Sequence, residues 1–221
     1  MTPPSVPRDL SLRVSLRDYW REVADVASAI DLSGLEEAAR TLLSCQARGR
    51  VVFAVGNGGS AATASHFACD LAKGTRGDGA PTFSAIALTD NVPLLTAWAN
   101  DVSYDRVFAE QLASLARPGD VLVAISASGN SPNVLAAAET ARAGGLVSIG
   151  LTGREGGRLA ALVDTVVHTP SDRIEIVEDV HLIVAHSLCV AARERLAACA
   201  RETDITPAAA PTAISSRRIG R

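Results

Sequence analysis

The stretch Val51-Val52-Phe53-Ala54-Val55-Gly56-Asn57-Gly58-Gly59-Ser60 decides the fold class. Its first half is a short, apolar, β-branched run, which is typical of a strand buried on both faces of a parallel sheet. Its second half is a glycine-rich loop, and a helical pattern follows to about Lys73. The stretch therefore predicts one strand–loop–helix unit.

Similar units recur along the chain and indicate a layered α/β protein. Further strands are predicted at Ser84–Leu88, Val121–Ile125, Leu146–Leu151 and Asp164–Thr169, and further helices at Val92–Ala99, Val107–Leu115, Asn133–Ala143 and Ile174–Ala200. Strands that alternate with helices predict a parallel sheet covered on both faces. We therefore expect a three-layer αβα fold with a five-stranded parallel sheet.

The N-terminal region shows a helical pattern from Leu10 to about Ala47, which is interrupted near Asp31-Leu32-Ser33-Gly34. Ser33 stands where it could cap a second helix, with Glu36 at the capping-box position. We expect a helical hairpin before the first strand. The predicted organisation is a flexible leader at 1–8, a single domain at 9–200 (hairpin 9–48, sheet and helices 49–200) and a disordered tail at 201–221.

Composition excludes several classes of protein. The net charge of −3 offers no electrostatic basis for binding nucleic acid or an acidic membrane. No apolar run approaches the roughly 20 residues of a membrane span. The four cysteines, Cys45, Cys69, Cys189 and Cys199, include no C-x-x-C pair, and the first three lie in apolar helical patterns. We expect buried, reduced thiols in a cytoplasmic protein.

Two loops have the composition of a phosphate site. Gly56–Ser60 and Ser126–Ser131 each join a predicted strand to a helix, where glycine exposes backbone N–H groups, serine adds hydroxyls and the helix adds its positive end. Tight turns would be the structural alternative, but two such loops at strand carboxyl ends favour one shared phosphate. The candidate residues are Asn57, Gly58, Gly59, Ser60, Ser126, Ala127, Ser128 and Ser131.

A second candidate site consists of two histidines and two carboxylates. His66 and Asp70 are four residues apart and share a helix face. Glu178 and His186 are eight apart on the last predicted helix, about 80° around its axis. Such a set suits a tetrahedral zinc ion. The alternative is that His66 only packs beside the loop and Glu178 is solvated.

Several segments together resemble the phosphoheptose isomerase family of the sugar isomerase (SIS) fold. They are Gly56–Ser60, His66-Phe67-Ala68, Ala99-Asn100-Asp101, Ile125–Ser131 and Leu151-Thr152-Gly153, in family order over about residues 10–195. The resemblance implies an enzyme that converts sedoheptulose 7-phosphate to a heptose 7-phosphate, as a homotetramer with zinc at each site.

The resemblance also implies roles for individual residues. The metal would be held by His66, Asp70, Glu178 and His186, with Asp70 as base and His186 as acid. Asn100 and Asp101 would contact sugar hydroxyls, and Glu178 would also face the substrate.

The chain departs from the family pattern at three of these positions. Asp70 replaces a glutamate, Glu178 a glutamine and Ala127 a hydroxyl residue. The segment Asp172-Arg173-Ile174-Glu175 also imitates the family's segment before the last helix, so Glu175 competes with Glu178 for that match. The spacing to His181 and His186 favours Glu178.

A second function stays open from the sequence. Relatives in this branch include a tetrameric, non-catalytic factor that binds the bacterial replication initiator. The departures at Asp70 and Glu178 are compatible with such a sugar-phosphate-binding or protein-interaction module. The enzyme is favoured, because both histidines and two metal-competent carboxylates are retained.

Overall fold

A five-stranded parallel sheet with the strand order β2-β1-β3-β4-β5 forms the centre of the molecule. The computed structural model describes residues 11–76 and 82–204. The strands are β1 (Val51–Val55), β2 (Ser84–Ala87), β3 (Val121–Ser126), β4 (Val147–Gly153) and β5 (Thr165–Thr169). The predicted fold class is confirmed, and each strand lies within two residues of its predicted bounds.

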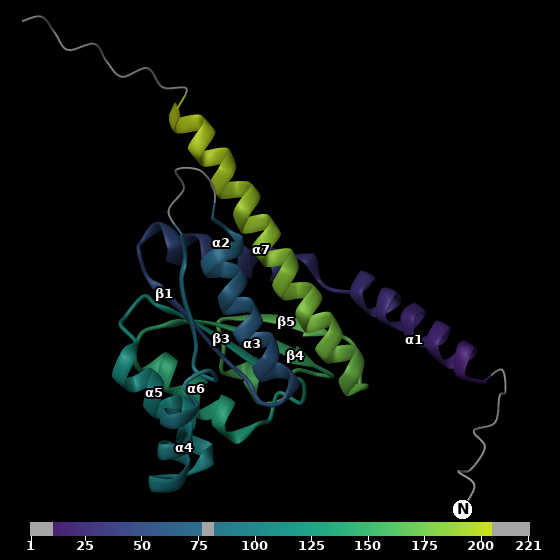
Figure 1. The fold of residues 1–221 in the computed structure, drawn as a ribbon, viewed down its shortest axis with the longest axis horizontal. Helices are drawn as coiled ribbons and strands as arrows, with labels where there is room; N and C mark the ends of the chain where they lie inside the picture. Colours follow the sequence, from purple (N-terminus) through teal and green to yellow (C-terminus); the bar gives the residue numbers. More distant parts are fainter. Residues whose placement is uncertain (1–10, 77–81, 205–221) are drawn as a thin grey trace, which may run out of the picture.

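Helices cover both faces of the sheet (Figure 1). The α-helices are α1 (Ser11–Ser28), α2 (Leu32–Ala47), α3 (Gly59–Cys69), α4 (Val92–Asp101), α5 (Val107–Leu115), α6 (Pro132–Ala143) and α7 (Ile174–Asp204). Shorter turns are η1 (Asp70–Gly74, a π-helix), η2 (Tyr104–Arg106) and η3 (Leu159–Ala161). α7 extends four residues into the predicted tail. The leader and the rest of the tail lie outside the described residues.

Successive side chains of β1 point to opposite faces of the sheet and enter two separate apolar cores. Val52 and Ala54 join the core beneath α2, α3 and α7, whereas Phe53 and Val55 join the core beneath α5 and α6. Burial on both faces explains why β1 reads as an unbroken apolar run. The order of the strands also reverses between β1 and β3, and ligands of open α/β sheets bind beyond the carboxyl ends of the strands at such a point.

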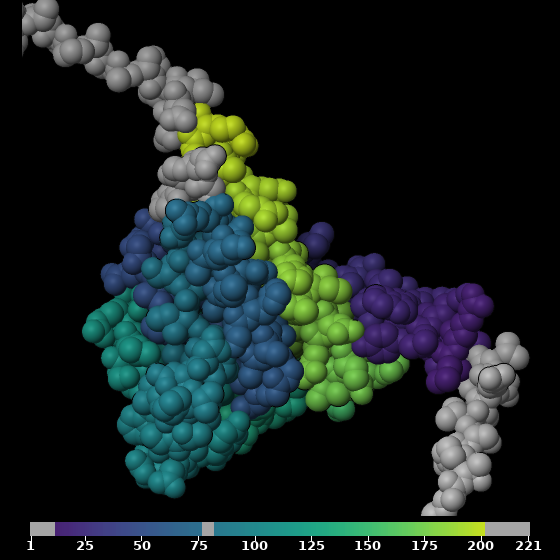
Figure 2. Space-filling model, in the orientation of Figure 1, coloured from purple at the N-terminus to yellow at the C-terminus, as the bar shows by residue number. Residues whose placement is uncertain are grey.

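The two N-terminal helices make different contacts. α2 packs against β5, α7 and the sheet, and α1 packs along α7. The Tyr19 hydroxyl donates to the Asp179 carboxylate at 2.6 Å, and this bond is the main cause that raises the pKa of Tyr19 to about 12. Arg173 also pairs with Glu22 across the two helices. Figure 2 shows α1 protruding from the rest of the domain.

Two local expectations from the sequence are wrong. Asp31, not Ser33, is the N-cap of α2, because its carboxylate accepts the Ser33 amide at 3.0 Å. Cys69 is exposed, whereas Cys45 and Cys189 are buried. Cys69 lies two residues after the buried Phe67 on α3, about 200° around the helix axis, so its side chain faces away from the core.

All four cysteines are free thiols. Within residues 11–76 and 82–204, no helix has a stretch that is long and apolar enough to cross a membrane.

A buried histidine makes stability depend on pH. His181 has no exposed surface, and burial lowers its pKa to about 4, with His168 adding to the effect. The nearby Thr152 backbone raises the pKa and so offsets part of the effect of burial. Neither ring nitrogen of His181 makes a hydrogen bond of normal geometry. Since the unfolded chain takes up this proton near pH 6.5, the native state binds fewer protons between pH 6.5 and 4.

We therefore expect the free energy of unfolding to fall as pH drops from 6.5 to 4, by about 3 kcal/mol from this residue. Urea unfolding at a series of pH values measures it. His181→Leu should flatten the profile in that window. A wild-type slope in this variant would contradict the assignment.

Candidate functional site

The two glycine- and serine-rich loops meet at one edge of the sheet. β1 and β3 are parallel neighbours, so the loops that follow them leave the sheet side by side. Asn57 and Asn133 exchange two amide hydrogen bonds of 2.8 Å, which fasten the first loop to α6. The Tyr104 hydroxyl donates to the Asn57 side-chain oxygen at 3.0 Å. The structure therefore brings the predicted phosphate residues into one region.

The second loop is held by short-range hydrogen bonds. The buried Ser126 hydroxyl donates to the Ser131 hydroxyl at 3.2 Å, and the Ser128 hydroxyl accepts the Asn130 amide at 3.1 Å. Neither loop contains a basic side chain. Backbone N–H groups, hydroxyls and the N-termini of α3 and α6 are therefore the donors that the loops offer to an anion.

The loop at 153–158 fits tightly against the second loop. The Leu159 amide donates to the Gly129 carbonyl at 2.9 Å, and the Arg158 amide donates to the Asn130 side chain at 3.1 Å. Gly129 has a φ of +63°, and a β-carbon there would lie 2.0 Å from the carbonyl oxygen of Gly156. The close approach of these two backbones therefore depends on glycine at position 129.

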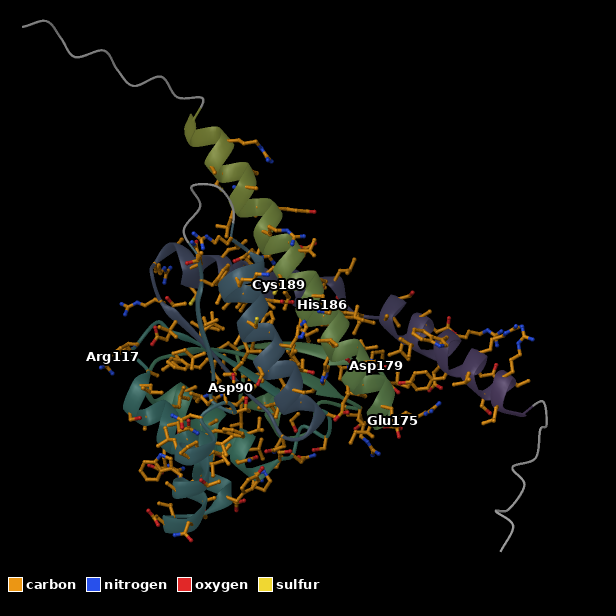
Figure 3. All side chains as sticks on the ribbon, in the orientation of Figure 1. Asp90, Arg117, Glu175, Asp179, His186 and Cys189 are labelled. Carbon is orange, nitrogen blue, oxygen red and sulfur yellow. The ribbon has the colours of Figure 1, made fainter. Side chains whose placement is uncertain are left out.

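The titratable residues of α3 and α7 meet because these helices lie side by side and run in the same direction (Figure 1). His66 Nε2 lies 2.9 Å from His186 Nε2. Asp70 Oδ2 lies 3.2 Å from His66 Nε2 and 3.7 Å from His186 Nε2. Figure 3 marks His186 on α7, with Cys189 one turn further along. Three of the four residues predicted to form one cluster, His66, Asp70 and His186, therefore lie together.

These three side chains fit a zinc ion. Their donor atoms lie within 4.8 Å of one another. A tetrahedral ion with ligands at 2.0–2.2 Å would separate the ligand atoms by about 3.4 Å, which is close to the observed spacings. Both imidazoles are about half exposed, so one side of the cluster stays accessible to a substrate. The short side chain of Asp70 does reach both histidines.

Cys189 does not belong to this group. Burial, together with the nearby Asp70 carboxylate, raises the pKa of its thiol to about 12. The thiol therefore stays protonated at neutral pH, and it packs in the core beneath α7.

Glu178 lies apart from the cluster, at the start of α3. A β-carbon on Gly59 would meet the Glu178 carboxylate at 2.3–2.5 Å, so this carboxylate rests against the first residue of the helix. His66 is seven residues further along, about 10 Å by helical rise. Glu178 therefore lies beside the first loop. Glu175, by contrast, lies near Tyr19 of α1, because its charge helps to raise the pKa of that tyrosine. Glu178, not Glu175, faces α3, as its spacing to His186 predicted.

Asn100 and Asp101 occupy the last turn of α4, where Asn100 donates to the Asp101 carboxylate at 2.8 Å. Both are exposed and bond to each other rather than to the loops. The sequence reasoning missed Asn133 and Tyr104, which do bond to the first loop. Asn133 could have been noticed, because it directly follows the second loop at the start of a helix.

Comparisons with known proteins identify the family to which the chain is similar. The SIS domain family matches residues 18–153. The chain is 44% identical over 155 residues to the phosphoheptose isomerase of Desulfovibrio desulfuricans, covering 70% of this chain and 73% of that protein. It is 42% identical over 166 residues to that of Alteromonas mediterranea, covering 74% and 83%. The solved phosphoheptose isomerase of Neisseria gonorrhoeae gives a TM-score of 0.77 at 34% identity, covering 83% of this chain and 99% of that one.

The contact between the second loop and Gly156 can be tested with two alanine substitutions. Gly129 and Gly49 share a φ of +63°, but a β-carbon at Gly49 would meet nothing within 4 Å. Gly49→Ala should therefore cost about 1 kcal/mol of stability, from backbone strain alone. Gly129→Ala should cost at least about 3 kcal/mol, because a backbone carbonyl blocks the new methyl group. Thermal unfolding measures both, and equal losses would contradict the close contact.

Proposed function

The chain belongs to the phosphoheptose isomerase family of SIS domain proteins, and we propose that it interconverts sedoheptulose 7-phosphate and an aldose heptose 7-phosphate. The observation that carries the proposal is the placement of two sites along one helix. The phosphate loop lies at the start of α3, and the cluster with His66 lies about 10 Å further along it. A seven-carbon sugar spans about 9–10 Å from its carbonyl carbon to its phosphorus, by ordinary bond lengths.

The proposed chemistry is aldose–ketose isomerisation through an enediolate. Asp70 removes a proton from the carbon beside the carbonyl and returns it to the neighbouring carbon. His186 Nε2 faces the metal position, so Nδ1 is the nitrogen that would donate a proton at the carbonyl oxygen. Asp70 Oδ2 faces both imidazoles, so Oδ1 is the oxygen available for proton transfer. Zinc held by His66, Asp70 and His186 would supply Lewis-acid polarisation of the carbonyl. Ser60, Ser126, Ser128 and Ser131, with Ala127 and Asn57–Gly59 offering backbone N–H groups, bind the phosphate.

Glu178 belongs to the substrate side of this proposal. Its carboxylate at Gly59 lies beside the phosphate loop and, in this structure, away from the three donor atoms of the cluster. We therefore assign Glu178 to the substrate region, and metal binding to the other three residues. Asn100 and Asp101 stay proposed contacts for sugar hydroxyls, since their segment leads directly into Tyr104 beside Asn57.

Purified protein supplied with zinc should interconvert sedoheptulose 7-phosphate and its aldose, and a five-carbon ketose phosphate should react poorly because it is too short. Asp70→Asn should lower turnover at least about 100-fold and reduce bound zinc, because it removes both a base and a charged ligand. Glu178→Gln should keep stoichiometric zinc and lower KM, since it removes a negative charge beside the phosphate.

Absence of turnover with zinc supplied would contradict the enzymatic proposal and favour the non-catalytic module. Loss of zinc in Glu178→Gln would restore Glu178 as a metal ligand. Elemental analysis and a coupled assay separate these outcomes.

The proposal extends to assembly and location. Leu12, Val14, Leu16 and Trp20 of α1 are 53–71% exposed, although all are large and apolar. An exposed patch of this kind marks an interaction surface. We propose that α1 packs against other copies of the chain in a homotetramer. The free thiols suit a reducing compartment such as the cytoplasm.

Light scattering coupled to size exclusion should give a mass near four times that of the chain. Trp20→Glu should shift the mass to a smaller species, because it places a charge in the proposed interface. Arg13→Glu, on the same exposed helix, should change the mass less. A monomeric wild type would contradict the proposal.

A further inference from the structure

Arg154 has an unusual backbone for its residue type. Among the residues that the structure describes, it is the only one other than glycine with a positive φ, at 52°. This conformation is unfavourable for a residue with a β-carbon. Glycine occupies positions 153, 156 and 157 of the same loop. A fourth glycine at position 154 would have avoided the backbone strain that the arginine introduces.

The contacts of Arg154 do not account for this cost. Its amide donates to the Ser171 carbonyl at 3.0 Å, a bond that any residue could make. Its guanidinium pairs with Asp172 at 3.3 Å, but the two side chains are 62% and 79% exposed. An ion pair so exposed contributes little to stability. The guanidinium is therefore easily released to a stronger partner.

Arg154 also lies beside the second phosphate loop. It lines a cavity of about 230 Å³ together with Ala127, Ser128 and Asn130. It lines an adjoining cavity of about 430 Å³ with Ser128, Asn130 and Gly157. Among the described residues, Arg154 is the only basic one that lines either cavity, whereas Asp172 lines both and Glu155 lines the larger.

A positive charge at position 154 would complement the negative charge of a bound phosphate. The loops at 56–60 and 126–131 hold no basic side chain, and Ala127 offers no hydroxyl. A phosphate dianion bound there would meet only partial positive charges from these loops, and a guanidinium matches two phosphate oxygens at once. Of the other arginines nearby, Arg158 lines neither cavity, and Arg173 is engaged by Glu22 on α1.

We propose that Arg154 is a phosphate-binding residue, which leaves Asp172 and pairs with the phosphate of the sugar held by the second loop. The inference rests on the proposed function, because it uses the same loop for the same phosphate. It adds the one full positive charge that the two loops lack.

The test compares Arg154→Gly with Arg158→Ala. Both remove one positive charge from the same loop, but the Arg158 side chain lines neither cavity. Arg154→Gly should weaken binding of inorganic phosphate and raise KM for sedoheptulose 7-phosphate by on the order of 10- to 100-fold. It should also unfold at an equal or higher temperature, because the strain is relieved. Arg158→Ala should change either binding measurement by less than about twofold.

Arg154→Lys keeps the charge without the planar fork and should show an intermediate loss, so it tests the proposal even if the glycine variant fails to fold. Equal phosphate affinity in wild type, Arg154→Gly and Arg154→Lys would overturn the inference. If the wild type turned over no sugar phosphate while phosphate binding still depended on Arg154, the proposed function would fail and the inference would stand.

Discussion

The parallel packing of α3 against α7 is the constraint on which the candidate site depends. Glu178 of α7 lies against Gly59 of α3, and two turns further along His186 of α7 lies against His66 of α3. The two contacts are therefore separated by nearly the same distance along both helices. A shift of one residue would rotate each side chain by about 100° and separate the two histidines. The packing is fixed from below by Val180 and Val184 of α7 and by Ala64 and Phe67 of α3, all in one core.

This arrangement gives α3 two chemically different ends. Its N-terminus, close to the second loop, offers neutral donors suited to an anion. Its C-terminus carries His66 and leads into the π-helix that begins at Asp70. The π-helix is a local departure from regular geometry of the kind that is frequent at functional sites. One rigid helix thereby fixes the distance between the group that is held and the group that reacts.

The loops at 126–131 and 153–158 form a second rigid unit. Their backbones approach so closely that glycine is required at 129, and Gly153 packs between the Ala127 carbonyl and Val177 of α7. The second loop is therefore braced by β4 and by the start of α7 together. The binding geometry for an anion is set by backbone contact, which keeps the donors in place before a ligand arrives.

Much of this could be predicted from residue types and periods. The apolar run 51–55 and its repeats determined a parallel sheet, and parallel strands place their loops at one edge whatever the other details. The sequence also determined that His66 and Asp70 share a helix face, because the i,i+4 spacing is a property of the helix itself. It could not show that Asp31 rather than Ser33 caps α2, since both residue types are good caps and only the backbone path chooses.

Only the tertiary structure decided which distant residues meet. Glu178 and His186 lie on one helix at a favourable angle, yet the partner helix places one at Gly59 and the other at His66, two turns apart. The place of Asn133 after the second loop could mark that residue, but its reciprocal bonds with Asn57 arise from contact between separate loops and could not be predicted. The positive φ of Arg154 had no sequence signal either. The sequence by itself thus determined which groups were available and on which face of an element. The packing of one element on another decided their partners, because that depends on side chains far apart in the chain.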